Sequence, residues 1–485
     1  MSTKHLLLEV TTGRAPTRLL VPIGSRAASR PHALDTTAAP VMPGLSLRSN
    51  FAWALAGNVV YAACQWGMIV ALAKLGSTLM VGQFSLGLAI ATPVLMFTNL
   101  HLRAAQATDA RRLYSFAEYL QLRSVMTLAA IAVIAAIAWF EHYERQTTIV
   151  ILAVALAKGI ETVSDIHYGL FQLNDRLDQT GISMMLRGAL SVFALSAGLY
   201  LTHDVFWGCV GLAMAWLAVL LLFDVRRAGR FVELPEDFLQ VSTWTRRRRP
   251  DCGAQGVRRQ WDLMCLALPL GIVTTLASIN LNMPRYFIEA RMGEHQLGIF
   301  SALAYATVAM TLVSDSLGHC VIPRMSRLYA RGQMAEFRSV VFQLSSLGCA
   351  LGLGGLALAK FMGSRLLTIV YSPQYATGSR VFVALMLATA IHCVAGMLTS
   401  GILSARCFKV QVPMFAVVVA STAWACYRLV PTSGLMGGAE AMVVGAAVRL
   451  VLAAIVIGYL LLVDARYVPG HSSPPLQIEE WKSSL

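Results

Sequence analysis

The chain has 485 residues, of which 56% are hydrophobic and only 13% are charged, and its formal net charge is +14. Together with a mean hydropathy of +0.62, this composition excludes ordinary soluble domains and disordered proteins and is typical of a polytopic membrane protein. The nine cysteines contain no CxxC pair. They therefore predict neither a metal site nor a redox site, and we expect no cofactor.

Residues 1–46 are rich in arginine, serine, threonine and proline and lack the apolar core of a signal peptide. They predict a disordered, basic cytoplasmic tail. An alternative interpretation is that the protein starts at Met42.

About twelve apolar segments follow, and each has roughly the 20 residues that a helix needs to cross the hydrocarbon core. They run approximately over 47–72, 79–102, 119–140, 147–171, 181–202, 205–223, 263–288, 296–320, 339–361, 380–404, 410–430 and 437–463. Backbone groups in lipid must bond internally, and these runs are too long for barrel strands. The predicted fold class is therefore an all-α polytopic membrane protein.

The basic residues alternate between the connections of these segments. With the N-terminus inside, 28 of the 39 lysines and arginines fall on the inner side, 8 on the outer side and three within spans. This asymmetry predicts that both termini are cytoplasmic and that the inner loops attract anionic membrane lipids. The net charge, including the run Arg246–Arg249, is thus explained by topology, and no nucleic-acid partner is expected.

The connection 224–262 predicts a cytoplasmic linker between two six-helix bundles, 47–223 and 263–463, and 464–485 predicts a cytoplasmic tail. The bundles resemble each other, because Gly82-Gln83-Phe84-Ser85 recurs as Gly298-Ile299-Phe300-Ser301, 216 residues later. An even number of spans per half makes the repeat parallel. Repeats that rock about a site near the midplane are typical of transport by alternating access.

Charged residues inside spans are costly and mark functional sites. In the fourth span Lys158, Glu161 and Asp165 fall within about 60° of one helix face. Arg187 of the fifth span lies at a depth similar to that of Asp165, which predicts an Asp165–Arg187 pair, either as part of a site or as a lock between two helices. Lys158 lies deeper and is expected to face a cavity.

In the second half, Asp315 and His319 lie at i and i+4, which predicts either a proton-sensitive pair or a helix end in the headgroup region. Arg449, in the middle of the twelfth span, is expected to pack between helices through hydrogen bonds.

Proline removes a backbone hydrogen bond and bends helices. Pro93, Pro269 and Pro284 are therefore predicted to act in gating. The sequence has no glycine-rich phosphate loop, no HExxH and no soluble domain, so we do not expect an enzyme.

Four stretches carry a family resemblance: Leu47–Asn58 (LRSNFAWALAGN), Leu102–Asp109 (LRAAQATD), Tyr168–Gln172 (YGLFQ) and Ser183–Gly188 (SMMLRG). They resemble the polysaccharide-export branch, the Wzx-type oligosaccharide flippases, of the multidrug/oligosaccharidyl-lipid/polysaccharide exporter superfamily. The resemblance spans about 47–463 and departs from the family in the N-terminal tail and in the arginine-rich central loop.

The resemblance implies a MATE-like fold of two six-helix bundles in a bacterial inner membrane. It implies translocation of an undecaprenyl-diphosphate-linked oligosaccharide for O-antigen, capsule or exopolysaccharide synthesis, alongside other glycan assembly proteins. For such a substrate we expect Lys158, Arg187, Arg48 and Arg103 to bind the anionic headgroup. We expect Glu161, Asp165, Asp315 and His319 to couple transport to H+ or Na+, if an ion gradient is used. The alternatives are a MATE-like cation-coupled drug antiporter and a polytopic polysaccharide polymerase or ligase.

Overall fold

The computed structural model describes residues 45–109, 113–231, 254–405 and 408–463. By internal contacts the chain divides into two units, 1–41 and 42–485, and all described residues lie in the second. The predicted tail 464–485, nearly all of the predicted tail 1–46 and the middle of the 224–262 linker fall outside the described residues.

Within the described residues, the first bundle consists of eight α-helices, and a π-helical turn connects the last two. They are α1 (Leu47–Leu75), α2 (Thr78–Asn99), α3 (Leu102–Thr108), α4 (Phe116–Phe140), α5 (Arg145–Leu173), α6 (Leu177–Thr202) and α7 (Val205–Val219), which continues through η1 (Leu220–Asp224) into α8 (Val225–Ala228). Polar caps begin several of them, as where the side chains of Ser46, Ser77 and Asp204 accept backbone N–H groups. Helix α5 is central, because it packs against α2, α4 and α7.

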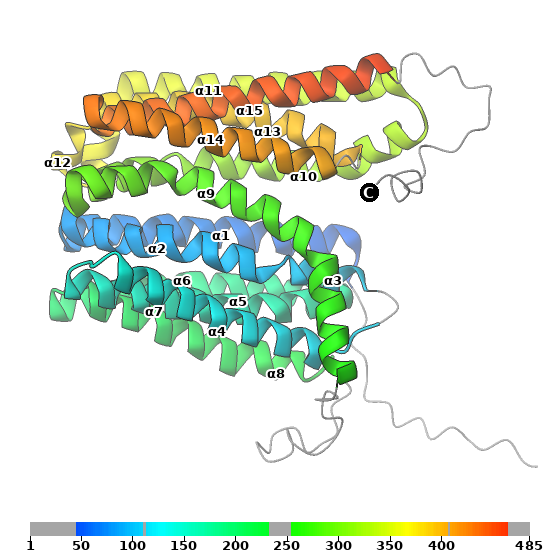
Figure 1. The fold of residues 1–485 in the computed structure, drawn as a ribbon, viewed down its shortest axis with the longest axis horizontal. Coiled ribbons are helices and arrows are strands. Elements are labelled where there is room, and N and C mark those ends of the chain that lie inside the picture. The colour runs from blue at the N-terminus through cyan, green and yellow to red at the C-terminus, as the bar shows by residue number, and fades with distance from the viewer. Residues whose placement is uncertain (1–44, 110–112, 232–253, 406–407, 464–485) are drawn as a thin grey trace, which may run out of the picture. The chain divides into compact units, whose positions relative to one another are not determined.

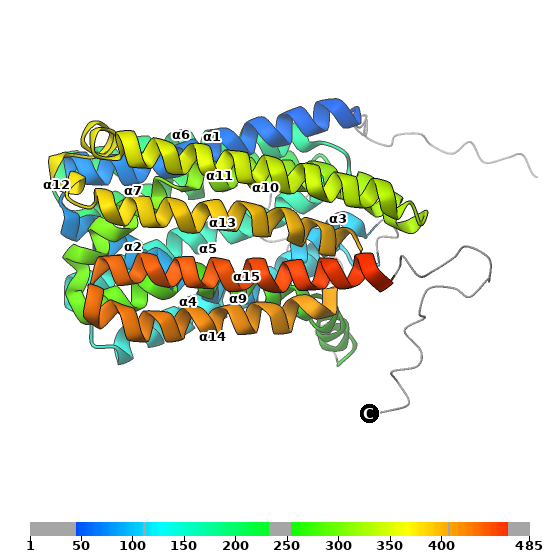
Figure 2. The ribbon, with the colours of Figure 1, turned by 90° about the horizontal axis from the view of Figure 1, so that it is seen from above.

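The second bundle follows the same plan. It contains α9 (Ala254–Tyr305), α10 (Val308–Ala330), α11 (Met334–Val370), α12 (Pro373–Ala376), α13 (Ser379–Ser404), α14 (Phe408–Ser433) and α15 (Leu435–Val463). Helices α11, α13, α15 and α14 lie side by side in that order (Figure 2). Helix α9 begins beside the first bundle, where Leu263 packs with Leu100 and Leu122, and then crosses into the second (Figure 1).

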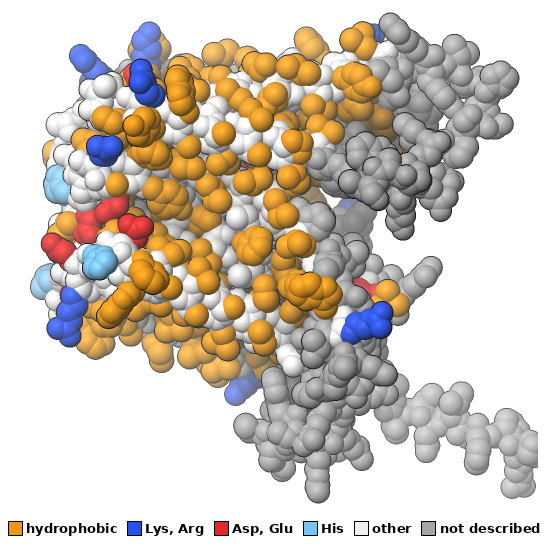
Figure 3. Space-filling view, viewed as in Figure 1, with side chains coloured by type: hydrophobic (Ala, Val, Ile, Leu, Met, Phe, Trp, Pro, Cys, Tyr) orange, Lys and Arg blue, Asp and Glu red, His pale blue; other side chains and the backbone are white. Residues whose placement is uncertain are grey.

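The described residues form helices and no strand, so the all-α prediction is confirmed. Within them, nine helices are long and apolar enough to cross a membrane, or ten if the bent pair 271–305 and 308–330 forms one span. Large apolar side chains such as Trp139, Phe193 and Phe361 are highly exposed. Hydrophobic atoms cover the middle of the face shown in Figure 3, and charged side chains gather toward its ends, as expected of a surface that faces lipid.

The two glycines that mark the internal repeat meet between the bundles. A Cβ atom on Gly82 would lie 1.9 Å from the carbonyl oxygen of Glu294, and one on Gly298 would lie 1.8 Å from the carbonyl oxygen of Thr78. Because only glycine fits, α2 and the end of α9 approach each other backbone to backbone. Gly293, with φ 80° and ψ 175°, is the break in α9 that turns this end toward α2.

Further hydrogen bonds join the bundles between this end, which the charge distribution predicts to be the outer one, and the middle of α2. They run from Trp66 Nε1 to Tyr371 Oη (2.9 Å), from Thr147 Oγ1 to Glu294 Oε1 (2.5 Å) and from Tyr286 Oη to the carbonyl oxygen of Ala89 (2.5 Å). The bundles are therefore closed against each other at the predicted outer end.

Candidate functional site

Charged side chains gather around α5 in the first bundle. This group, the N-terminal charge cluster, comprises Arg103 of α3, Arg123 of α4, Lys158, Glu161 and Asp165 of α5, Arg187 of α6 and Asp224 of η1. Four cations thus face three acids.

Asp165 is held by two arginines. Arg103 Nη1 lies 3.2 Å from Asp165 Oδ1, and Arg123 Nη2 lies 3.3 Å from Asp165 Oδ2. Arg123 is only 1% exposed and also donates to Asn99 Oδ1, whereas the Arg103 and Asp165 side chains are 33% and 30% exposed. Asp165 therefore links a buried arginine to one that reaches open space.

About one turn before Asp165 on α5, Glu161 accepts one hydrogen bond from Lys158 Nζ at 2.5 Å and another from the hydroxyl of Tyr61. The Lys158 ammonium also lies 5.6 Å from the centre of the Trp216 ring, where a cation is favoured. Both members of the Lys158–Glu161 pair keep about a fifth of their side-chain surface exposed. The expectation that Lys158 faces a cavity stays a prediction.

Arg187 is buried, with 2% of its side chain exposed. Its guanidinium lies 5.3 and 5.9 Å from the centres of the Tyr168 and Trp216 rings, and its Nη2 atom lies 3.5 Å from Asp224 Oδ2. Asp224 is fully buried at the end of the π-helical turn. Such turns are frequent at functional positions because they rotate the residues that follow.

The predicted Asp165–Arg187 pair is wrong. Asp165 pairs with Arg103 of α3 and Arg123 of α4, whereas Arg187 lies 4.0 Å from Glu161 and pairs with Asp224. Depth follows from position along a helix, whereas the partner depends on how each helix is rotated about its axis.

Sequence reasoning missed Arg123, Asp224 and Tyr61. A signal existed for Arg123, because Ser115 and Glu118 form a capping box, which places residue 123 two turns inside the helix. Asp224 was detectable as a lone acid that ends a very apolar span. Nothing in the sequence marks Tyr61 as a partner of Glu161.

The stretches that carry the family resemblance contact one another at the predicted inner end of this bundle. The Tyr168 hydroxyl lies 2.8 Å from Ser183 Oγ, and the guanidinium groups of Arg103 and Arg187 lie 5.5 and 5.3 Å from the centre of the Tyr168 ring. Asn50 Nδ2 donates to the carbonyl oxygen of Asp175 at 2.9 Å. The stretch 168–172 therefore contacts two arginines of the charge cluster and bonds to the stretch 183–188 that carries one of them.

The other predicted site residues lie away from this cluster. Arg48 is exposed at the start of α1. Pro93 lies within α2, and helical backbone continues through Pro269 and Pro284 in α9, whose break is at Gly293. The side chain of His319 lies outside the described residues. A gating role for the prolines stays a prediction.

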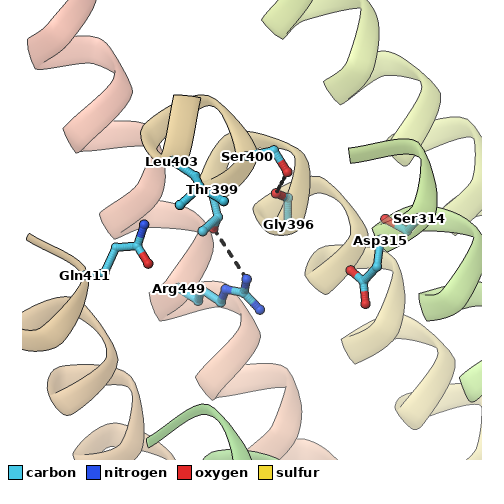
Figure 4. Close-up of a pocket in the computed structure, with 8 residues that line it drawn as sticks. All are labelled: Ser314, Asp315, Gly396, Thr399, Ser400, Leu403, Gln411 and Arg449. Atoms are coloured by element: carbon cyan, nitrogen blue, oxygen red, sulfur yellow. Dashed lines mark hydrogen bonds between the residues drawn. The ribbon is translucent and has the colours of Figure 1, made fainter. Parts of the chain in front are cut away.

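Asp315 lines a polar pocket of about 140 Å³ in the second bundle. This C-terminal pocket is bordered by Ser314, Asp315, Gly396, Thr399, Ser400, Leu403, Gln411 and Arg449 (Figure 4). Arg449 donates to His392 Nδ1 at 3.1 Å and lies 3.4 Å from Thr399 Oγ1, which confirms its predicted hydrogen-bonded packing between helices. Among the described residues, no group of three histidine, cysteine or acidic side chains could hold a metal ion.

No model of a known protein family matches the chain. It is 22% identical over 405 residues to the capsular polysaccharide biosynthesis protein CapF of Staphylococcus aureus, which covers 83% of this chain and 97% of that protein.

Solved structures share its fold. A structure of the lipid II flippase MurJ in an inward closed conformation superimposes with a TM-score of 0.65 at 10% identity, covering 85% of this chain and 93% of that one. The MATE transporter VcmN of Vibrio cholerae gives 0.59 at 11% identity, covering 86% and 96%. An inward-facing MATE transporter of the MOP superfamily gives 0.57 at 12% identity, covering 88% and 98%.

These likenesses confirm the MATE-like fold and the resemblance drawn from the sequence. The chain is a multi-pass membrane protein with the fold of the transporters and flippases of this superfamily. The solved structures named here are transporters and flippases rather than enzymes.

Proposed function

We propose that this protein translocates an undecaprenyl-diphosphate-linked oligosaccharide from the cytoplasmic to the outer leaflet of a bacterial inner membrane, for the synthesis of a cell-surface polysaccharide. The similarity to CapF supports the polysaccharide pathway, and the fold shared with MurJ supports a lipid-linked substrate.

The observation that carries the proposal is the pair of partly exposed cations, Arg103 and Lys158, within the N-terminal charge cluster. A charge in a membrane span is costly unless it is paired or faces water. A diphosphate offers several acceptor oxygens, and its hydrogen bonds to arginine or lysine are charge-assisted. The polyprenyl tail can remain in lipid while these side chains hold the headgroup.

The buried cations have a different task in this proposal. Arg123 and Arg187 are almost completely enclosed, and each contacts an acid of the cluster. They position Asp165 and Asp224 and keep the cluster positive without contacting substrate. The role that the family resemblance gives to Arg187 as a headgroup ligand thus becomes a positioning role.

Ion coupling follows from the same contacts. A phosphate that draws Lys158 toward itself leaves Glu161 without its closest cation, and Glu161 can then take up a proton or sodium ion. In the same way, a phosphate that draws Arg103 toward itself leaves Asp165 with only one of its two arginines, Arg123. The closed outer end and the accessible cations together suit alternating access in which the headgroup enters from the cytoplasmic side, where we expect both termini to lie.

The second candidate is a drug antiporter, which the MATE structures favour. The excess of cations over acids in the cluster argues against this function, because a site for cationic drugs requires an excess of acids. A deletion strain separates the two. We expect loss of the surface polysaccharide, accumulation of its lipid-linked precursor and unchanged drug sensitivity; raised drug sensitivity with normal polysaccharide would favour the antiporter.

A further inference from the structure

The C-terminal pocket contains buried polar atoms that form no hydrogen bond with the described residues around them. Gln411 is 8% exposed, and its Nε2 atom has no hydrogen-bond partner among the described residues. The same holds for Arg449 Nε. Buried donors are normally paired, and an unpaired donor beside a cavity indicates a ligand or water that completes it.

Acceptors lie opposite these donors. The Ser400 hydroxyl donates to the carbonyl oxygen of Gly396 at 3.1 Å (Figure 4), so its oxygen lone pairs remain available as acceptors. The Asp315 carboxylate, which also lines the pocket, is a stronger acceptor. The pocket therefore offers donors from α14 and α15 and acceptors from α10 and α13.

The charges of the lining select the class of ligand. Arg449 and Asp315 have opposite signs, and His392 accepts a hydrogen bond from Arg449, so its ring is neutral. A phosphate would meet the Asp315 carboxylate, and a cation would meet the Arg449 guanidinium. A neutral group with several hydroxyls, each both donor and acceptor, matches the lining best.

Space for such a group comes from Gly396. A Cβ atom on this glycine would meet nothing nearer than Asp315 Oδ1 at 3.9 Å, so Gly396 opens directly into the pocket. The pocket volume of about 140 Å³ is comparable to the cavity of roughly 150 Å³ that admits a benzene molecule. It therefore has room for the six-membered ring of a sugar, with some of its hydroxyl groups extending out of the pocket.

We infer that the C-terminal pocket is a sugar subsite, which holds one neutral sugar ring of the glycan headgroup through Gln411, Arg449, Ser400 and Asp315. This inference rests on the proposed function, because the sugar is that of the translocated lipid. Helix α10 also contacts α1 of the other bundle, so the pocket is built partly from a helix of the interface between the bundles.

Two variants test the subsite while preserving the fold. Gly396→Leu fills the pocket from a helical position where glycine is otherwise unfavourable. Gln411→Leu removes a buried amide whose Nε2 atom has no partner among the described residues, so it should not lower the thermal stability. The controls are Gly354→Leu, at a glycine with open space around it, and Gln343→Leu, at an exposed glutamine on α11.

The probes are undecaprenyl diphosphate and the lipid-linked oligosaccharide extracted from cells that lack the protein. Their affinities are measured on the purified full chain in nanodiscs. We expect both variants to weaken binding of the oligosaccharide lipid about tenfold, the loss of one or two good hydrogen bonds, and to leave binding of undecaprenyl diphosphate unchanged. The controls should bind both lipids normally.

Unchanged binding of the oligosaccharide lipid by both variants would overturn the subsite, since it would mean that the pocket holds only water. Equal weakening for both lipids would also overturn it, because the pocket would then act on the diphosphate or on the fold. If the wild-type protein binds neither lipid, the proposed function itself fails, which is a distinct result.

Discussion

Lys158 Nζ lies 2.5 Å from Glu161 Oε2, one turn away on α5, and both side chains remain partly exposed beside a fully enclosed Arg187. Together with Arg103 and Asp165, the pair thus belongs to the part of the N-terminal charge cluster that a ligand can reach without unfolding the bundle. A cation held by a single close acid partner is also one that a phosphate can recruit.

Lys158→Ala should lower polysaccharide export at least tenfold at a normal protein level, and Lys158→Arg should retain part of the activity. Glu161 keeps Tyr61 as a hydrogen-bond donor and Arg187 nearby, so folding should survive the change. The measurement is complementation of a deletion strain, with protein quantified in membranes. Lys74→Ala, at an exposed lysine near the outer end of α1, is the matched control and should export normally. Wild-type export by Lys158→Ala would remove this lysine from the site.

Arg187→Met should destabilise the protein strongly, by about 3–5 kcal/mol, because it leaves the buried Asp224 without its cation. The double variant Arg187→Met with Asp224→Leu should recover most of the loss. Thermal unfolding in detergent measures both. A double variant no more stable than the single one would show that Asp224 does not depend on Arg187.

Gly82→Ala should destabilise the contact between the bundles, since the new methyl group meets the Glu294 carbonyl and the backbone cannot yield without separating α2 from α9. Gly298→Ala should have the same effect through Thr78. Each should lower the melting temperature, whereas Gly354→Ala should not. Two variants with unchanged melting temperatures would mean that this close approach contributes nothing to stability.

The charge asymmetry predicts which connections face the cytoplasm. In a cysteine-free background, Gln333→Cys should resist a membrane-impermeant maleimide in intact cells and react after permeabilisation. His203→Cys, at an exposed outer turn, should react in both conditions. The opposite pattern would reverse the orientation of the whole protein.

The sequence allowed the helices to be predicted because apolar length, proline and charge are local signals. It also showed the repeat, but not that Gly82 and Gly298 touch, because equivalent positions meet only when they lie near the axis that relates the bundles. The error at Asp165 has the same origin. Its place along the helix was readable, but its partner depended on the rotation of α5 and on the π-helical turn that brings Asp224 to Arg187.

The C-terminal pocket was partly visible in the sequence. Asp315 and Arg449 stood out as charges inside spans, whereas Gln411 and Gly396 did not, because an amide and a glycine are common in helices. Gln411 matters because its Nε2 atom lacks a hydrogen-bond partner in the described part of the chain, and Gly396 matters because it borders the pocket. Both properties depend on how the helices pack.

The most direct test of the central claim is translocation in vesicles. The purified protein is reconstituted with the extracted lipid-linked oligosaccharide in both leaflets, and periodate is added outside to oxidise the sugars that it reaches. We predict nearly complete oxidation with the wild-type protein, as the inner pool crosses, and about half with Lys158→Ala or in empty vesicles. Oxidation of only half of the lipid with the wild-type protein, with or without an imposed proton or sodium gradient, would contradict the claim.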